Sequence, residues 1–200
     1  MASYTSVPGH IRVGAGTLWW APLGTSEPTL TTTAGKLATV TGVSGWVNIG
    51  ATDNGSTFAR QVSTGDVTPE ENFYPELIAT TGITESVSFA LLYMSPDNWL
   101  LAMNGGTTST AGTAGTALTT YTPPAPGSEV NRMLIWQSAD DSERMIWRSV
   151  FNAGQVSLVR QKSPNKAMLA VEFRVLQPAS GAAWTRYSAD QVLGATGSGG

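Results

Sequence analysis

The sequence predicts an all-β fold, a β-sandwich or partial barrel, with one short helix. Strand-forming runs recur along the chain, turn residues separate them, and a single segment carries helix signals. The 200 residues favour one domain, and 41% hydrophobic residues including 7 Trp supply a core. We predict that domain over residues 1–190, with an N-terminal arm at 1–15 and a flexible C-terminal arm at 191–200.

The first half of the chain predicts three strands around one tight turn. Segment 17–21 is β-prone and ends at Pro22. Segments 46–49 and 57–62 flank Asp53-Asn54-Gly55, and the Asn-Gly pair predicts a hairpin because both positions tolerate positive φ. Segment 83–93 predicts a longer strand.

The second half predicts two more hairpins. Segments 132–138 and 144–151 flank Asp140-Asp141-Ser142, and segments 155–160 and 167–176 flank Ser163-Pro164-Asn165.

One helix is predicted between the strands. Ser95 suits the N-cap, Pro96 the first helical position and Asp97 the first turn. Gly105-Gly106 stops the helix, and its packing face carries Trp99, Leu100 and Met103.

Two low-complexity stretches are predicted to be loop insertions, at residues 28–45 and 105–128. Both are rich in Thr and Gly, and neither holds enough apolar surface to form a core of its own.

Side-chain alternation separates two kinds of strand. In segment 83–93 one parity is small and hydroxylated, and the other, predicted to face the core, carries Ile83, Val87, Phe89 and Leu91 with Glu85 as the exception. Segment 144–151 is mixed, with large apolar residues on both parities, so it is either a central strand or a strand covered by another chain.

Charged residues make up only 12% of the chain, against about 25% in ordinary soluble domains. This shortage indicates surface buried against other subunits, and a secreted Thr/Ser-rich surface protein explains it equally well. The net charge of −3 argues against tight nucleic-acid binding, and the lack of cysteine excludes disulfides and thiolate zinc sites. The N-terminus lacks signal-peptide features, so we expect synthesis in a cytoplasm.

No segment predicts an enzyme, a cofactor site or a metal site. His10 is the single histidine and has no cysteine or second histidine as a partner. Ser163 and Lys166 have the Ser-x-x-Lys spacing of some acyl-transfer enzymes, but they lie between strands instead of opening a helix. Asp140-Asp141 are adjacent and point to opposite faces of a strand, which does not suit an acid–base pair.

The region 16–55 carries a family resemblance. Gly16 to Thr25, then Pro28-Thr29, then Trp46 to Gly50, then Asp53-Asn54-Gly55 follow one another in an order that resembles the major tail tube proteins of siphophages, especially those infecting actinobacteria. The later strand–helix–hairpin layout agrees in outline. Ala51 and Asp53-Asn54 depart from the family pattern, which often has an aromatic residue and Glu-Asp there.

The resemblance implies a structural virion protein that forms hexameric rings stacked into a tail tube for DNA ejection. Each subunit gives a hairpin pair to a lumen-lining β-barrel, a long loop joins the rings, and the terminal arms bridge neighbours. The implied partners are further copies of the chain, the tape-measure protein, the tail terminator and distal tail proteins. DNA crosses the lumen without sequence-specific binding, and the protein resides in the virion tail after assembly in the host cytoplasm.

Within this interpretation, the lumen candidates are hydroxyls and a carboxylate, because a cationic lining would hold DNA. They are Thr84, Ser86, Ser88 and Glu172. A plain solvent face is the alternative.

The acidic segment 63–82 is predicted to dock on a basic surface of the next ring, with ordinary intrachain pairing as the alternative. Its candidate residues are Asp66, Glu70, Glu71, Phe73, Tyr74 and Leu77. The complementary basic candidates are Arg144, Arg148, Arg160, Lys162 and Lys166.

Two other functions remain open on the sequence. A carbohydrate-binding or decoration β-sandwich would expose Trp136, Trp147 or Trp184 to stack on sugar rings. A capsid-associated structural protein is the other.

Overall fold

The computed structural model describes residues 16–30, 32–33, 36–67, 74, 77–160 and 166–189. The predicted arms at 1–15 and 191–200 lie outside these residues, as do Glu70, Glu71, Phe73 and Lys162.

Most strands join one sheet in the order β4-β1-β9-β10-β12-β6-β5, with β11 also paired to β12 and β13 to β10. The strands are β1 (Gly16–Pro22), β4 (Val47–Asn48), β5 (Thr52–Val67), β6 (Leu77–Leu91), β9 (Arg132–Ser138), β10 (Glu143–Asn152), β11 (Ser157–Val159), β12 (Met168–Val175) and β13 (Trp184–Ser188).

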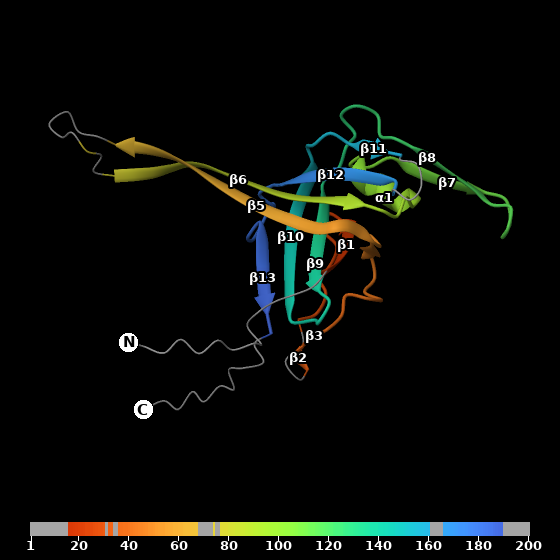
Figure 1. Cartoon of the computed structure of the whole chain (residues 1–200), viewed down its shortest axis with the longest axis horizontal. Helices are drawn as coiled ribbons and strands as arrows, with labels where there is room; N and C mark the ends of the chain where they lie inside the picture. The colour runs from red at the N-terminus through yellow and green to blue at the C-terminus, as the bar shows by residue number, and fades with distance from the viewer. Residues whose placement is uncertain are drawn as a thin grey trace.

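The sheet folds over on itself at β10. The first half of β10 lies between β9 and β13, whereas its last residues, Val150 to Asn152, pair with β12 in place of β13. Strands β12, β6 and β5 therefore run across β9, β10 and β13 as a second layer (Figure 1). This open, two-layered sheet is the predicted sandwich or partial barrel.

Two hydrophobic clusters cover the two sides of β10. The larger lies between the layers and draws buried residues from β1, β6, β9, β10, β12 and the helix, among them Trp20, Phe89, Trp147 and Phe173. The smaller lies on the other side of β1, β9 and β10 and includes Trp19, Ile135 and Ile146. Of the two interpretations of segment 144–151, the structure therefore shows the central strand covered by its own chain.

The hairpin predicted at Asp53-Asn54-Gly55 is wrong. Strand β4 pairs with β1, with Asn48 opposite Trp19, and β5 runs straight through the Asn-Gly pair. The register between β5 and β6 shifts between Asp53 and Ser56, so these residues form a bulge, with Gly55 at φ 77°. A bulge uses the same positive φ as a tight turn, and the local sequence does not distinguish them.

The prediction that residues 28–45 form a loop insertion without a share in the core is wrong. It contains the short strands β2 (Thr32–Thr33) and β3 (Lys36–Leu37), and Leu37 and Val40 are buried. Val40 belongs to the smaller cluster, so this segment closes the second side of the sheet.

The predicted loop 105–128 contains a hairpin. Strand β7 (Thr107–Ala111) pairs with β8 (Leu118–Thr122), and all of these residues except Tyr121 are exposed. Its threonines favour extended backbone, which the loop prediction overlooked.

Helix α1 (Pro96–Ala102) starts as predicted, with the Ser95 side chain accepting a hydrogen bond from the Asn98 backbone N–H at 3.2 Å. It ends before the glycines, because Asn104 takes the left-handed conformation at φ 55°. Trp99 and Leu100 pack against the larger cluster, and Met103 is the half-buried C-cap. None of the described residues forms a helix long and apolar enough to cross a bilayer.

Candidate functional site

Three neighbouring strands present one continuous polar surface to solvent. In their register, Thr57 lies opposite Ser88 and Ser88 opposite Glu172, so these side chains share a face. We call this surface the polar face. It consists of Thr57, Ala59, Gln61, Thr84, Ser86, Ser88, Ala90, Ala170, Glu172 and Arg174. The other face of the same strands carries the core residues Val87, Phe89 and Phe173.

The structure brings the four lumen candidates onto this face. Ser86, Ser88 and Glu172 lie close together in register, and Thr84 lies further along β6, opposite Gln61. Thr57, Ala59 and Gln61 were missed because the predicted strand 57–62 was paired with 46–49 and not with 83–93. Aligning the alternating pattern of segment 83–93 with that of segment 57–62 would have identified these three residues.

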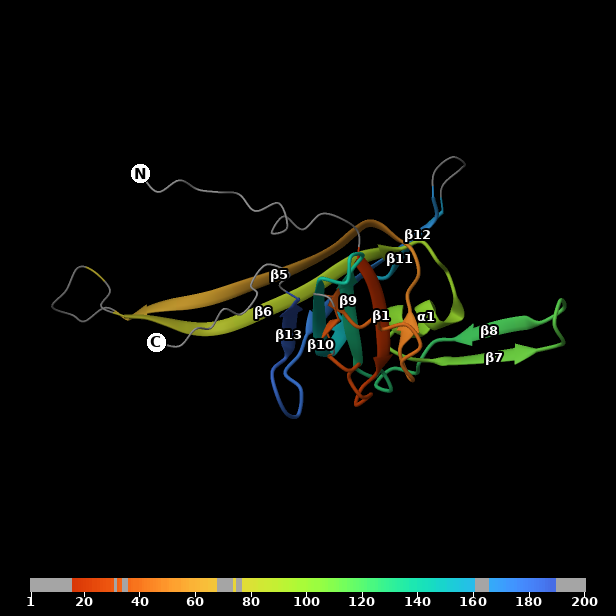
Figure 2. The ribbon, with the colours of Figure 1, turned by 90° about the horizontal axis from the view of Figure 1, so that it is seen from below.

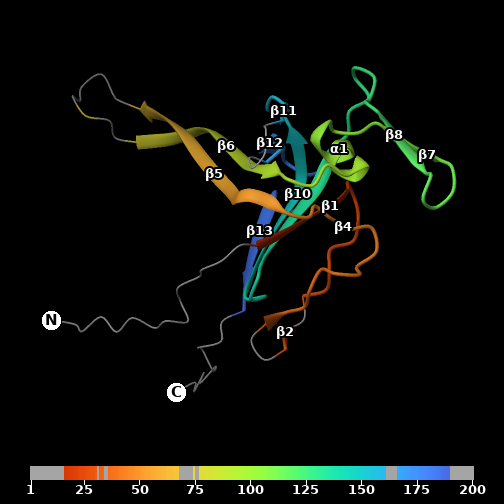
Figure 3. The same ribbon diagram turned by 45° about the vertical axis from the view of Figure 1, so that its right-hand side comes forward.

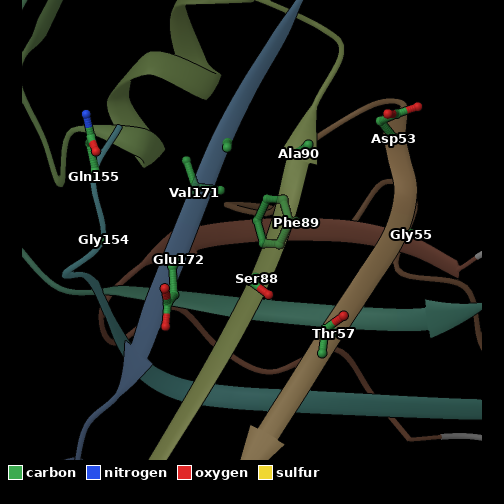
Figure 4. Close-up of a pocket in the computed structure, with 11 residues that line it drawn as sticks. Asp53, Gly55, Thr57, Ser88, Phe89, Ala90, Gly154, Gln155, Val171 and Glu172 are labelled. Carbon is green, nitrogen blue, oxygen red and sulfur yellow. The ribbon is translucent and has the colours of Figure 1, made fainter. Parts of the chain in front are cut away.

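A shallow groove of about 510 Å³ crosses the polar face (Figure 4). Its floor comes from β5, β6 and β12, including Thr57, Ser88 and Glu172, and its rim comes from Gly154 and Gln155. A Cβ at Gly154 would lie 2.8 Å from the Glu172 Cβ, so only glycine allows this close approach. Across the described residues, no group of three or more metal-binding side chains occurs.

Charges on and around the polar face are of mixed sign. Glu172 and Arg174 alternate along β12, and Lys166 forms an ion pair with Asp53 at 2.8 Å at the rim. Arg174 is the one cation among the defined residues of the face, and Glu172 lies two residues away. The face is therefore close to neutral.

Strands β5 and β6 continue beyond the body as a long projecting hairpin (Figures 1, 2 and 3). In the acidic segment 63–82, predicted to be a loop, residues 63–67 and 77–82 are strand, since β5 runs to Val67 and β6 begins at Leu77. Asp66 and Leu77 are exposed on these strands, and Tyr74 near the tip is 81% exposed.

The basic candidates do not form one surface. Arg144 is fully buried, where it donates to the Gln137 Oε1 at 3.1 Å and to the Ala38 carbonyl, so its prediction as a docking residue is wrong. Burial lowers the pKa of Arg144, and the charge of Asp141 opposes that shift. The side chain became buried because segment 36–40 folds over this part of the sheet.

The other basic candidates are mostly engaged within the chain. Arg148 forms an ion pair with Glu27 at 2.5 Å and donates to the Ala182 carbonyl at 2.9 Å. The hydrogen bond with Glu27 raises the pKa of Arg148. Lys166 pairs with Asp53, and Arg160 is exposed. Intrachain pairing, the alternative interpretation, therefore describes Arg148 and Lys166.

The tryptophans expected to stack on sugars contribute to packing instead. Trp147 is 2% exposed, and Trp136 and Trp184 are half-buried against the larger cluster. Gly16 lies so close to the Trp136 indole that a Cβ there would clash with it. These positions give the carbohydrate-binding alternative no support.

The fold is an open, two-layered β-sheet with a polar outer face and a long projecting hairpin. Comparison with known families places the chain within one of them: the phage tail tube protein family matches residues 8–196. The chain belongs to that family, and it is a structural component of a phage tail.

Other comparisons add little. No curated protein matches the sequence. One similar solved structure is a chain of the anti-feeding prophage baseplate, determined by cryo-EM with 6-fold symmetrisation, at 12% identity and a TM-score of 0.43. That similarity covers 92% of this chain and 99% of the other.

Proposed function

We propose that copies of this chain join into hexameric rings, which stack into a siphophage tail tube with the polar face lining the lumen. DNA passes through this lumen during ejection. The observation that carries the proposal is the polar face itself: three adjacent strands are small and polar on one side and form the core on the other.

Such a lining suits the passage of a polyanion. Duplex DNA carries about one charge per 1.7 Å of its axis, so a cationic bore would hold it through counterion release. On the polar face, Glu172 is close to Arg174, and the remaining residues are hydroxyls, alanines and one amide. Neutral hydroxyl groups give DNA no electrostatic hold.

The strand edges also favour assembly. Strand β5 spans Thr52–Val67 at one end of the sheet, and among the described strands only β6 pairs with it. A long open edge offers unpaired backbone groups to another chain. Rings of side-by-side copies would close such edges in the way a barrel does.

The further partners in this proposal are the tape-measure protein in the lumen, a tail terminator and distal tail proteins. Assembly takes place in the host cytoplasm, and the finished protein resides in the virion tail. The proposed role needs no catalytic group and no cofactor.

Electron microscopy of the purified chain over a range of concentrations tests the proposal. We expect rings or tubes with an open central bore. Closed shells would instead favour a capsid-associated protein, and persistent monomers whose tryptophan fluorescence responds to glycans would favour a sugar-binding module.

A further inference from the structure

The core side of the projecting hairpin changes character where it leaves the body. Phe58, opposite Val87, is covered by Trp147 and Trp184, with ring centroids 5.7 Å and 5.1 Å away. The next pair on this side is the ion pair between Arg60 and Glu85, at 3.3 Å. That pair marks the edge of the region that the chain's own core covers.

Beyond this ion pair, the same side of the hairpin carries exposed apolar side chains, with Thr64 opposite Thr80 between them. Val62 lies opposite Ile83, and they are 47% and 53% exposed. After a bulge at Thr81, Ile78 lies opposite Asp66 and is 64% exposed. We call Val62, Ile78 and Ile83 the apolar back of the hairpin.

Next to the body, the opposite side of these strands carries Gln61, Ser63 and Thr84, so this part of the ribbon is amphipathic. Toward the tip, that side carries Val67 opposite Leu77 and both sides hold apolar residues. A two-stranded ribbon by itself is marginally stable in water and needs an apolar partner on one face. No described residue outside the ribbon packs on Val62 or Ile78 within either hydrophobic cluster.

A groove of about 380 Å³ continues the apolar back toward the body. One wall is Ile83 with the Arg60–Glu85 pair, and the other is formed by residues 175–177 and 182–184. Leu176 in this wall is 36% exposed, and Trp184 is half-buried. The apolar back and the groove therefore form one surface with an ion pair at its rim, the arrangement typical of protein interfaces.

We infer that the body of a neighbouring copy covers the apolar back and this groove. The inference rests on the proposed function. If the front of the ribbon lines the lumen, its back lies inside the tube wall, and the chain's own body ends at the Arg60–Glu85 pair. The wall beyond that point consists of another copy. The contact joins different surfaces of two identical chains, and such head-to-tail contacts close into rings when the rotation permits.

The absence of cysteine from the chain allows a clean test with single-cysteine variants. Ile83→Cys places a thiol on the apolar back, and Thr84→Cys, one residue later on the same strand, places one on the polar face. Both positions are exposed in the single chain, so both thiols should react with a small maleimide before assembly.

In assembled tubes we expect the thiol at position 83 to react at least about tenfold more slowly, because burial denies access, and the thiol at 84 to keep its rate. A fast-reacting thiol at 83 in tubes would overturn the inference. Protection at 83 already in the monomer would overturn it too, because the chain itself would then cover the site.

A matched pair of charge variants separates assembly from folding. We expect Ile83→Asp to raise the concentration needed for tube formation at least about tenfold, since it buries an unpaired charge in the contact, and Thr84→Asp to assemble as the wild type does. Both should keep the wild-type circular dichroism spectrum. Normal assembly of Ile83→Asp would contradict the inference while leaving the proposed function standing. Failure of the wild-type chain to form tubes would instead remove the proposed function.

Discussion

At the scale of single residues, buried polar side chains tie separate segments together. Arg144 and Gln137 both donate to the Ala38 carbonyl, which holds segment 36–40 on the sheet. Asn152 plays a similar part, since its Nδ2 donates to the Ala102 carbonyl at 2.5 Å and its backbone N–H donates to Asn104 Oδ1 at 2.7 Å. These contacts join the end of α1 to β10.

Arg144→Ala should therefore affect folding. It removes a fully buried side chain and leaves the Gln137 Oε1 and Ala38 carbonyl with fewer partners. We expect the free energy of unfolding, measured by urea denaturation, to fall by about 2–4 kcal/mol. The exposed Arg174→Ala serves as the control and should stay within about 0.5 kcal/mol of wild type. Equal stabilities would show that the buried contacts contribute nothing net.

Asp140 gives a pH-dependent prediction at the turn between β9 and β10. Hydrogen bonding from Ser138, and then from Ser142, lowers its pKa from 3.8 to about 2. A lowered pKa stabilises the folded state above the unfolded value, and that contribution is lost as pH falls through the folded value. Asp140→Asn should thus melt at a lower temperature than wild type at pH 7. The difference should shrink from about pH 4 to about pH 2, and a constant difference would contradict this cause.

At the scale of elements, two hairpins leave the body on opposite sides (Figure 2). The β5–β6 hairpin grows out of the main sheet and shares its register with β12. The β7–β8 hairpin is a separate two-stranded sheet, held through Tyr121, whose hydroxyl donates to the Gly105 carbonyl at 2.9 Å and whose ring stacks on Trp99. One hairpin extends the sheet, and the other is attached to the helix.

Replacing residues 107–122 with a short glycine linker should leave the body folded. Nearly all of these residues are exposed, and Tyr121 supplies the main contacts. We expect the free energy of unfolding to change by less than about 2 kcal/mol, the scale of one aromatic contact and one hydrogen bond. Loss of cooperative unfolding in calorimetry would show that the hairpin supports the core.

At the scale of the whole molecule, the folded-over sheet gives one set of strands two roles. Strands β6 and β12 fill the larger core with alternate residues and form the polar face with the others. The period of two along a strand makes this division possible, and the second layer decides which side is covered.

A cationic substitution on the polar face should convert a neutral lining into one that holds DNA. For tubes of the double variant Thr57→Lys, Ser88→Lys, we expect retention of short duplex DNA at low salt and release as salt rises. Wild-type tubes and tubes of Ser88→Glu should retain none. A filter-retention assay against salt concentration measures this, and equal retention by all three would place the polar face away from the lumen.

Local signals determined several elements from the sequence alone. The N-cap at Ser95 and the turn at Asp140-Asp141-Ser142 lie where capping and turn chemistry placed them, because both depend on neighbouring residues. The alternation of 83–93 gave the buried face of β6 correctly at Val87, Phe89 and Leu91. Ile83 is the exception, since the body ends before it.

Tertiary structure alone decided the partners of these elements. The Asn-Gly pair at 54–55 fits a tight turn and a bulge equally, and only the long pairing of β5 with β6 selected the bulge. The burial of Arg144 depended on a segment about a hundred residues earlier in the chain folding over it, as its contact with Ala38 shows. Periodicity and caps are local and can be read along the chain, whereas strand pairing and burial depend on which distant segments meet.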